Sequence, residues 1–274
     1  MSTFLSFIIA ALPVCNAEVC KDVGSGLLWE NDKFGMFAYG PTEYHRWSGL
    51  DVFNKSGEGT SCISWLKDPK LNDFFKHPNF HDNRGNGMDN YAMGAARGVG
   101  GVALWADGEW KTYTPWIESK IICATDDVLE IELVYPEFSC LGKMTYHITL
   151  KRGEYFYKNV VTFEFPERMH SAFRVGPGID LEPKRGHYGS LKEGDNFVSL
   201  FEDPRGADGS TMSAIVVPRS EKIEFMIDHL NCRVLAFKKA SFTYYAGASW
   251  TGRGEFKSAG DWHRMVEEFA STLK

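Results

Sequence analysis

At residues 144–151 the chain reads MTYHITLK, in which apolar and polar side chains alternate without a break. A period of two is typical of an antiparallel strand with one buried face and one polar face. The same alternation returns in VLEIELVY at 128–135 and in KIEFMID at 222–228. Further strands are predicted at 35–39, 100–105, 155–165, 197–201, 212–217, 233–237 and 242–246. Because short turns separate these strands, the pattern predicts an all-β chain that forms one large antiparallel sandwich.

Helical periodicity occurs at two places. SAGDWHRMVEEFASTL, residues 258–273, repeats large apolar side chains at helical spacing and begins with two residues that can cap a helix, Ser258 and Asp261. Residues 63–75 predict a second helix. The stretch VGPGIDLEPKRG, residues 175–186, is rich in glycine and proline and predicts a loop over a sheet edge. We expect the C-terminal helix to pack on the sandwich.

The composition of the 274 residues narrows the class of protein. A net charge of −6 without any basic cluster argues against nucleic acid as a partner. Aromatic side chains make up 14% of the chain, including 8 Trp and 11 Tyr. Such rings fill the cores of sheets, and they also stack on the apolar faces of sugar rings. Composition leaves both uses open.

The first residues, MSTFLSFIIAALPVCNAEVC, predict a secretory signal peptide at 1–17. Its apolar stretch is too short to cross a bilayer, so no membrane span is expected. Residues 18–274 are then a single domain that works in the periplasm or outside the cell. The alternatives are a buried first strand, a mis-assigned start, and a lipoprotein cysteine at Cys15.

No motif for a bound cofactor occurs in the sequence. The six cysteines include no Cys-x-x-Cys pair, and P-loop, nucleophile-elbow and His-Glu-x-x-His motifs are absent. DNRGNG at 82–87 is similar to a calcium loop but lacks the terminal glutamate. We therefore expect neither a metal nor a cofactor, while disulfides and buried free thiols both stay open.

The segment FHDNRGNGMDNYAMGAARGVGGVALW, which begins at Phe80 and ends at Trp105, combines titratable side chains with glycines. Glycine lets the backbone approach a polar ligand closely. His81 and Tyr91 are candidates for a general base and a general acid, and Asp89 could orient the imidazole. The alternative is a surface loop with solvated charges.

Other candidates lie within and beyond this segment. Arg84 and Arg97 could each clamp a carboxylate with two hydrogen bonds. His170 and His229 are reserve proton-transfer residues, and Glu202 is a candidate base in what otherwise reads as a surface turn. A second cluster combines a cation, an imidazole and two stacking surfaces, or else is an exposed loop; it consists of Tyr44, His45, Arg46 and Trp47.

Three motifs of the chain resemble one exported bacterial family of unknown function, which is associated with polysaccharide-utilisation gene clusters. The matching residues are Trp29-Glu30-Asn31-Asp32, then His81, Gly85, Gly87, Met88, Asp89, Tyr91 and Gly94, then Tyr244, Tyr245, Gly247, Ala248 and Trp250. Asn83 stands where the family pattern has an acidic residue. The resemblance implies a galactose-mutarotase-like supersandwich whose concave sheet face holds a sugar. It adds Asn31 and Tyr245 to the substrate-binding candidates.

We expect a carbon–oxygen lyase that acts on uronic-acid-containing oligosaccharides by β-elimination or dehydration. An arginine would neutralise the uronate, His81 would remove the C5 proton, and Tyr91 would protonate the oxygen that leaves C4. His170 is a further catalytic candidate. Two alternatives stay open: an aldose mutarotase or epimerase, with a histidine acid and a carboxylate base, and a non-catalytic glycan-binding module. The module would stack sugars on Trp29, Tyr44, Trp47 and Trp105.

Overall fold

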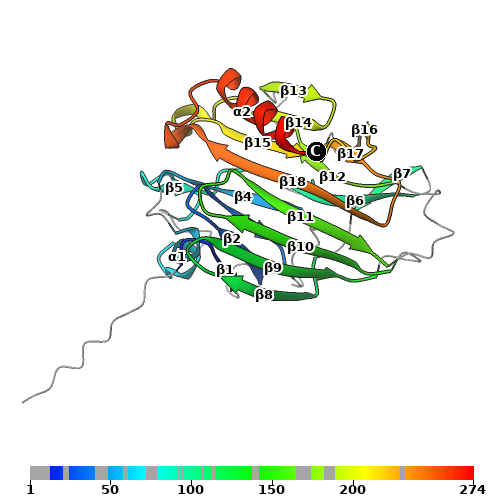
Figure 1. The fold of residues 1–274 in the computed structure, drawn as a ribbon. Helices are drawn as coiled ribbons and strands as arrows, with labels where there is room; N and C mark the ends of the chain where they lie inside the picture. The colour runs from blue at the N-terminus through cyan, green and yellow to red at the C-terminus, as the bar shows by residue number, and fades with distance from the viewer. Residues whose placement is uncertain are drawn as a thin grey trace, which may run out of the picture.

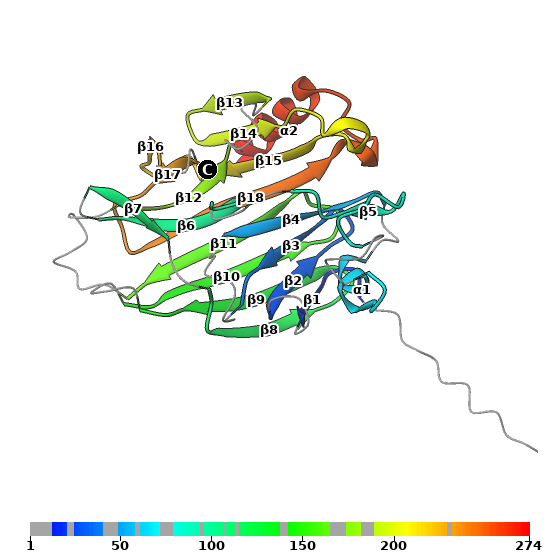
Figure 2. The same ribbon diagram turned by 180° about the vertical axis from the view of Figure 1, so that it is seen from behind.

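The protein is a β-sandwich with helices on its outside, as Figures 1 and 2 show from opposite sides. The structure is a computed structural model, and it describes the chain with gaps. The described residues are 13–20, 25–40, 49–57, 61–71, 79–91, 93, 96–106, 108–112, 115–137, 142–164, 174–181, 189–228 and 232–274.

The described strands form three antiparallel sheets. The eight-stranded sheet has the order β13 (Ser190–Gly194), β14 (Phe197–Phe201), β15 (Thr211–Val216), β18 (Ser241–Trp250), β11 (Phe156–Phe163), β10 (Met144–Lys151), β9 (Val128–Tyr135), β8 (Glu118–Ala124). One five-stranded sheet consists of β1 (Asn16–Cys20), β2 (Gly26–Glu30), β3 (Phe34–Ala38), β4 (Leu50–Lys55) and β5 (Gly87–Met88). The other has the order β16 (Glu224–Ile227), β17 (Cys232–Ala236), β12 (Arg174–Asp180), β6 (Val99–Ala106), β7 (Glu109–Thr112).

The predicted all-β sandwich with a C-terminal helix is confirmed. MTYHITLK is strand β10, and its side chains alternate between buried and half-exposed until the exposed Lys151 at its end. VLEIELVY is strand β9 and pairs with β10 in a register that places Met144 opposite Tyr135. The inward-facing side chains of these strands join those of the two smaller sheets in one core.

The two five-stranded sheets lie side by side and together face the eight-stranded sheet (Figure 2). They meet where Leu50 of β4 forms an isolated parallel bridge with Gly98, just before β6. Gly98 has a φ of 63°, and a Cβ added there would lie 1.9 Å from the carbonyl oxygen of Leu50. At this position the glycine-rich segment therefore serves backbone packing between two sheets.

Helix α2 (Ala259–Thr272) packs on the outer face of the eight-stranded sheet, over β14 and β15. Its own residues Trp262, Val266 and Ala270 are buried against the sheet. The Ser258 side chain caps the N-terminus of the helix by accepting a hydrogen bond from the Asp261 N–H. The helix predicted at residues 258–273 is therefore present. The other predicted helix is much shorter than expected: α1 (Cys62–Lys67) is followed by an extended cap at Asp68, and residues 72–78 lie outside the described part.

The prediction of a loop at 175–186 is wrong for its first half. Residues 174–180 form β12, which lies between β17 and β6 in its sheet. Pro177 lacks an N–H donor, and the pairing with β6 shifts register between Pro177 and Ile179. A bulge of this kind lets a proline enter an inner strand.

Three further expectations concern the cysteine thiols, a membrane span and the signal peptide. Within the described residues, the free thiols are Cys15, Cys20, Cys62, Cys123 and Cys232. None of the described helices is both long enough and apolar enough to span a membrane. The first 12 residues of the predicted signal segment lie outside the described part, and β1 includes Asn16 and Ala17.

Candidate functional site

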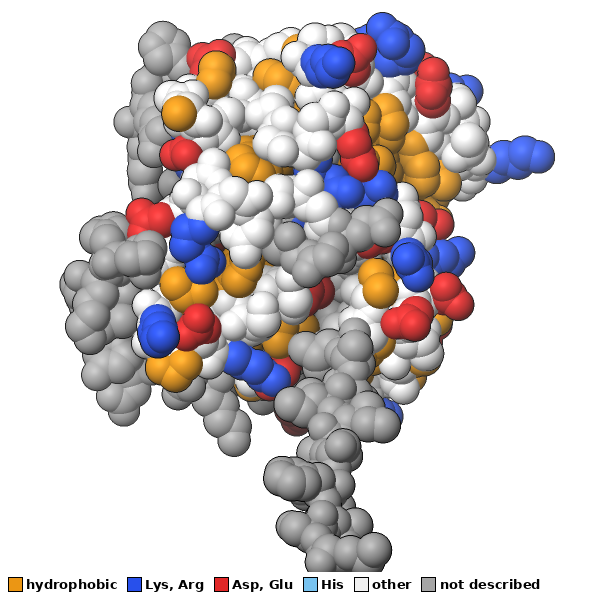
Figure 3. Space-filling model, turned by 90° about the vertical axis from the view of Figure 1, so that its left-hand side faces the viewer, with side chains coloured by type: hydrophobic (Ala, Val, Ile, Leu, Met, Phe, Trp, Pro, Cys, Tyr) orange, Lys and Arg blue, Asp and Glu red, His pale blue; other side chains and the backbone are white. Residues whose placement is uncertain are grey.

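A hollow of about 560 Å³ lies where the segment around β5 meets the connection between β14 and β15. Its size is in the usual range for a small-molecule site. Figure 3 looks onto this end of the molecule, where acidic and basic side chains are interspersed. The hollow is lined by His81, Asp89, Asn90, Tyr91, Pro204, Arg205, Gly206 and Asp208.

A hydrogen-bonded asparagine holds the two sides of the hollow together. Asn54 on β4 donates through Nδ2 to Asn90 Oδ1 at 2.6 Å and to Thr211 Oγ1, at the start of β15, at 2.9 Å. On the β5 side, the Asp89 N–H donates to the Phe80 carbonyl at 2.8 Å. Strands β4 and β15 belong to different sheets, so the sandwich itself sets the distance between the two walls.

His81 has the geometry of a general base. Its Nδ1 lies 2.7 Å from the carbonyl oxygen of Asp89 and 3.3 Å from Asp89 Oδ2. A carbonyl oxygen only accepts, so Nδ1 carries the proton and the neutral ring keeps its lone pair on Nε2. The ring also packs against Phe80, with centroids 4.2 Å apart. These contacts fix both the tautomer and the orientation of the imidazole.

Three consecutive residues beside His81 carry buried polar atoms that find no hydrogen-bond partner among the described residues. They are Asp89 Oδ1, Asn90 Nδ2 and Tyr91 Oη. An unsatisfied buried donor or acceptor costs about 1–3 kcal/mol, so each of these atoms would be stabilised by a ligand or an ordered water that reaches it. Together they offer donors and acceptors to a ligand rich in hydroxyl groups.

Two buried carboxyl groups on this side are shifted toward the neutral form. Burial raises the pKa of Asp51, on β4, to about 7, against the opposing effect of the hydrogen bond from Tyr39 at 3.0 Å. Burial, and then the charge of Asp51, raise the pKa of Asp89 well above its ordinary value. Two carboxylates that interact in low dielectric do not both ionise readily. Arg205, on the opposite wall, lowers both pKa values.

Tyr91 is suited to donate a proton rather than to accept one. Only 5% of the residue is exposed, and burial raises the pKa of its phenol well above the ordinary value. The charges of Asp180 and Glu202 raise it further. The phenol therefore stays protonated at neutral pH, and Tyr91 is one of the residues that line the hollow.

Sequence reasoning missed several charged residues in and around the hollow. Glu202 was expected in a surface turn, but it is 2% exposed and pairs with Arg205 at 3.0 Å. Asp51 was not considered at all, although a carboxylate within the apolar run LDVF is a detectable signal. Arg205 had no such signal, because only the pairing of β14 with β15 brings it opposite His81.

Comparison with known proteins places the chain in a family without assigned chemistry. A family model described as a domain of unknown function, DUF4861, matches residues 17–274. The chain belongs to the DUF4861 family. It is also similar to an uncharacterized protein, P7, from Formosa agariphila, with 23% identity over 94% of this chain and 68% of that protein.

Solved structures give only remote likenesses. The GH36 α-galactosidase AgaA from Geobacillus stearothermophilus matches with 11% identity and a TM-score of 0.39, over 82% of this chain and 40% of that one. A variant of the same enzyme in complex with raffinose matches with a TM-score of 0.38, 11% identity and the same coverage. This DUF4861 chain thus spans about two fifths of the length of the solved enzymes it matches.

Two arginines predicted to clamp a carboxylate lie outside the lining of the hollow. Arg97 is 1% exposed, pairs with Asp228 at 2.7 Å and lies over the ring of Trp110. Arg84 is exposed and lies over the ring of Trp65 at 5.9 Å. Their clamp roles are therefore corrected: Arg97 is held in a buried ion pair and Arg84 in a surface contact, and Arg205 is the arginine at the hollow.

The Trp-Glu-Asn-Asp motif of this DUF4861 chain is structural. Trp29 is completely buried and packs edge-on against Tyr157, so its ring is not available to stack on a sugar. Asn31 is also completely buried; its Nδ2 donates to the carbonyl oxygens of Lys151 and Glu154 at 2.7 and 2.8 Å. The motif thereby ties the β2–β3 turn to the β10–β11 turn, and both sugar-binding predictions are corrected.

Two other aromatic candidates also lie away from the hollow. Trp105, on β6, packs against Trp110 on β7. Tyr245, on β18, packs against Phe269 of helix α2, on the outer face of the large sheet. The remaining candidates fall outside the described residues: Tyr44, His45, Arg46, Trp47, His170 and His229.

The described part of the chain contains no group of three or more His, Cys, Asp or Glu side chains arranged to hold a metal ion. The hollow thus combines an oriented imidazole, a protonated phenol, a carboxyl group whose pKa is raised by burial, and one guanidinium. Proton transfer to and from a polar organic ligand is the chemistry that these groups can perform.

Proposed function

We propose that this hollow is the active site of a carbon–oxygen lyase acting on uronic-acid-containing oligosaccharides, in the periplasm or outside the cell. The observation that carries the proposal is the arrangement of His81 and Tyr91 in one hollow. The Asp89 carbonyl directs the proton of the imidazole to Nδ1, and the buried phenol keeps its own proton. A base and an acid are thus available together at neutral pH.

The elimination uses each group once. Nε2 of His81 removes the proton at C5, and the electron pair of that C–H bond forms the C4–C5 double bond. The bond from C4 to the leaving oxygen breaks as that oxygen takes the proton of Tyr91. The proton on His81 then returns to the phenolate, directly or through water, which restores both residues.

Arg205 takes the role that the sequence suggested for Arg84 or Arg97. A guanidinium at the sugar carboxylate stabilises the negative charge that develops when the C5 proton is removed. Because Arg205 also pairs with Glu202, its position is set before a ligand binds. The raised pKa of Asp89 supports this arrangement, since a carboxyl group shifted toward its neutral form repels a uronate less than an ordinary carboxylate does.

One observation favours a second candidate, an aldose mutarotase or epimerase. That chemistry needs a histidine and a carboxylate, and the buried Glu202 lies close enough to influence the pKa of Tyr91. In this reading a protonated His81 donates from Nε2 to the ring oxygen while a carboxylate removes the proton of the anomeric hydroxyl group.

A screen against acidic and neutral oligosaccharides separates the candidates. The lyase reaction raises the ultraviolet absorbance of a C4–C5 double bond, and product masses distinguish loss of water from loss of a sugar. Faster decay of the optical rotation of a free sugar, without new absorbance, selects the mutarotase. Binding without turnover selects the glycan-binding module and contradicts the lyase proposal.

A further inference from the structure

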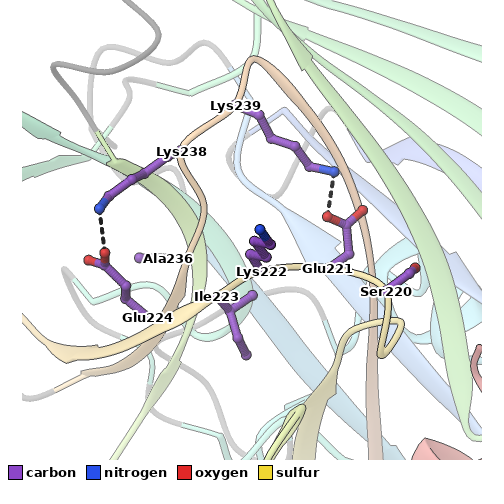
Figure 4. A pocket seen from close by; sticks show the side chains of 8 residues that line it. All are labelled: Ser220, Glu221, Lys222, Ile223, Glu224, Ala236, Lys238 and Lys239. Atoms are coloured by element: carbon purple, nitrogen blue, oxygen red, sulfur yellow. Dashed lines mark ion pairs between the residues drawn. The ribbon is translucent and has the colours of Figure 1, made fainter.

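A second hollow, of about 530 Å³, lies beside strands β16 and β17 (Figure 4). Figures 1 and 2 both place these strands at the opposite end of the sandwich from β5, which borders the first hollow. The second hollow is lined by Ser220, Glu221, Lys222, Ile223, Glu224, Ala236, Lys238 and Lys239. None of these residues takes part in the chemistry proposed above.

The charges around this hollow are unbalanced. Lys238 pairs with Glu224 at 2.6 Å, and Lys239 pairs with Glu221. Glu224 is also bound by Arg174 at 2.5 Å. Lys222 is exposed, has no ion pair or hydrogen bond among the described residues, and projects between the two pairs in Figure 4.

Four cations therefore meet two carboxylates here, which leaves two excess positive charges on a chain whose net charge is −6. Hydrogen bonds from Lys238 and Arg174 lower the pKa of Glu224, so it remains an acceptor at neutral pH. An excess of this kind raises the local concentration of anions.

The lining also suits a sugar ring. The half-buried Ile223 supplies apolar surface for the C–H face of a ring, while Ser220 and the two glutamates can bond hydroxyl groups. Ammonium groups around an apolar floor match a ring that carries both hydroxyls and a negative group. A neutral sugar would leave the lysines without a role, and a simple inorganic anion would leave the apolar floor without one.

We propose that this second hollow is an accessory binding site for an anionic sugar residue, carboxylated or sulfated. It holds a part of an acidic glycan away from the hollow at β5. The inference goes beyond the lyase proposal and does not depend on it, because binding here requires no reaction.

The test uses the full chain with the first hollow disabled by His81→Ala and Tyr91→Phe. In this background, Lys222→Gln, Lys238→Gln and Lys239→Gln are combined in one pocket variant. A matched control variant carries Lys120→Gln, Lys158→Gln and Lys257→Gln, three exposed lysines that do not line the hollow. Calorimetry measures the binding of an oligogalacturonate, a sulfated oligosaccharide and a neutral oligosaccharide of similar length.

We expect the pocket variant to bind at least one of the two anionic ligands roughly tenfold more weakly than the parent, because several charge contacts are lost. The control should match the parent, and neutral-ligand binding should not change. The anionic ligand whose binding weakens in the pocket variant identifies the recognised group as a carboxylate or a sulfate. Equal losses in both variants, or no anionic binding in the parent, overturn the inference. Loss of turnover in the native protein bears only on the lyase proposal.

Discussion

At the scale of single residues, His81 shows how a short segment can build most of a site. His81, Asp89 and Tyr91 lie within eleven positions of one another, and the Asp89–Phe80 backbone hydrogen bond brings them together. Their proximity could therefore be predicted from the sequence. The burial of Arg97 and Trp29 could not be predicted from the sequence, because only the fold determines that both side chains are buried.

Asp51 gives the clearest expected pH effect on stability. Its pKa is raised from 3.8 to about 7 in the folded chain, so its contribution to stability is fully present below about pH 4 and is lost as the pH rises through 7. Asp51→Asn removes that titration. The variant should lose less stability than the wild type between about pH 5 and pH 8, by on the order of 2 kcal/mol. Urea unfolding of the variant and the wild type at several pH values between about 5 and 8 measures the free energy of unfolding.

The matched control for that experiment is Asp127→Asn, at an exposed position on the turn before β9. Its pH profile should follow the wild type. If Asp51→Asn also gives a profile parallel to the wild type, the raised pKa of Asp51 is contradicted.

At the scale of elements, the period of two predicted β9 and β10, each of which has one buried face and one half-exposed face. Strands β9, β10 and β14 occur at the predicted residues. Strands β2 and β4, in which every residue is buried, show no alternation between buried and exposed positions and were missed. Their polar residues, such as Glu30, therefore gave no sign of their structural role.

Glu30 at the end of β2 is expected to hold three elements in place. Its carboxylate pairs with Lys55 at 2.9 Å and accepts hydrogen bonds from Ser61 Oγ and the Cys62 N–H at the start of α1. Glu30→Ala leaves the ammonium group of Lys55, whose side chain is 2% exposed, without its counter-charge. The variant should lose about 3–5 kcal/mol in chemical denaturation. Glu118→Ala, at an exposed strand position, should lose less than about 0.5 kcal/mol. Similar losses in the two variants would count against this role.

At the scale of the whole molecule, the junction of the two smaller sheets depends on a glycine. Gly98 combines a positive φ with direct contact to the Leu50 backbone, whereas Gly108 has a φ of 84° and open space around it. Gly108→Ala should therefore cost only backbone strain, about 1 kcal/mol. Gly98→Ala should cost about 3 kcal/mol or more, because the bridge must open. Thermal unfolding of both variants tests this, and equal costs would contradict the junction.

The topology also explains which parts of the site were predictable. The β5 wall comes from one continuous segment, and the sequence predicted that its candidate base and acid, His81 and Tyr91, lie close together; their catalytic roles stay predictions. The other wall comes from residues more than a hundred positions later, and only the packing of β4 against β15 through Asn54 places it opposite. Sequence spacing carries no information on such a long-range approach.

The most direct test of the account is the elimination rate of His81→Ala on the acidic oligosaccharide that the screen identifies, followed by the absorbance of the new double bond. Arg84→Gln, at an exposed residue outside the hollow, is the matched control. The account predicts that kcat falls about a hundredfold or more in His81→Ala and in Tyr91→Phe, and stays within about twofold in the control. A folded His81→Ala protein that retains the wild-type kcat would contradict the claim that this hollow is the active site.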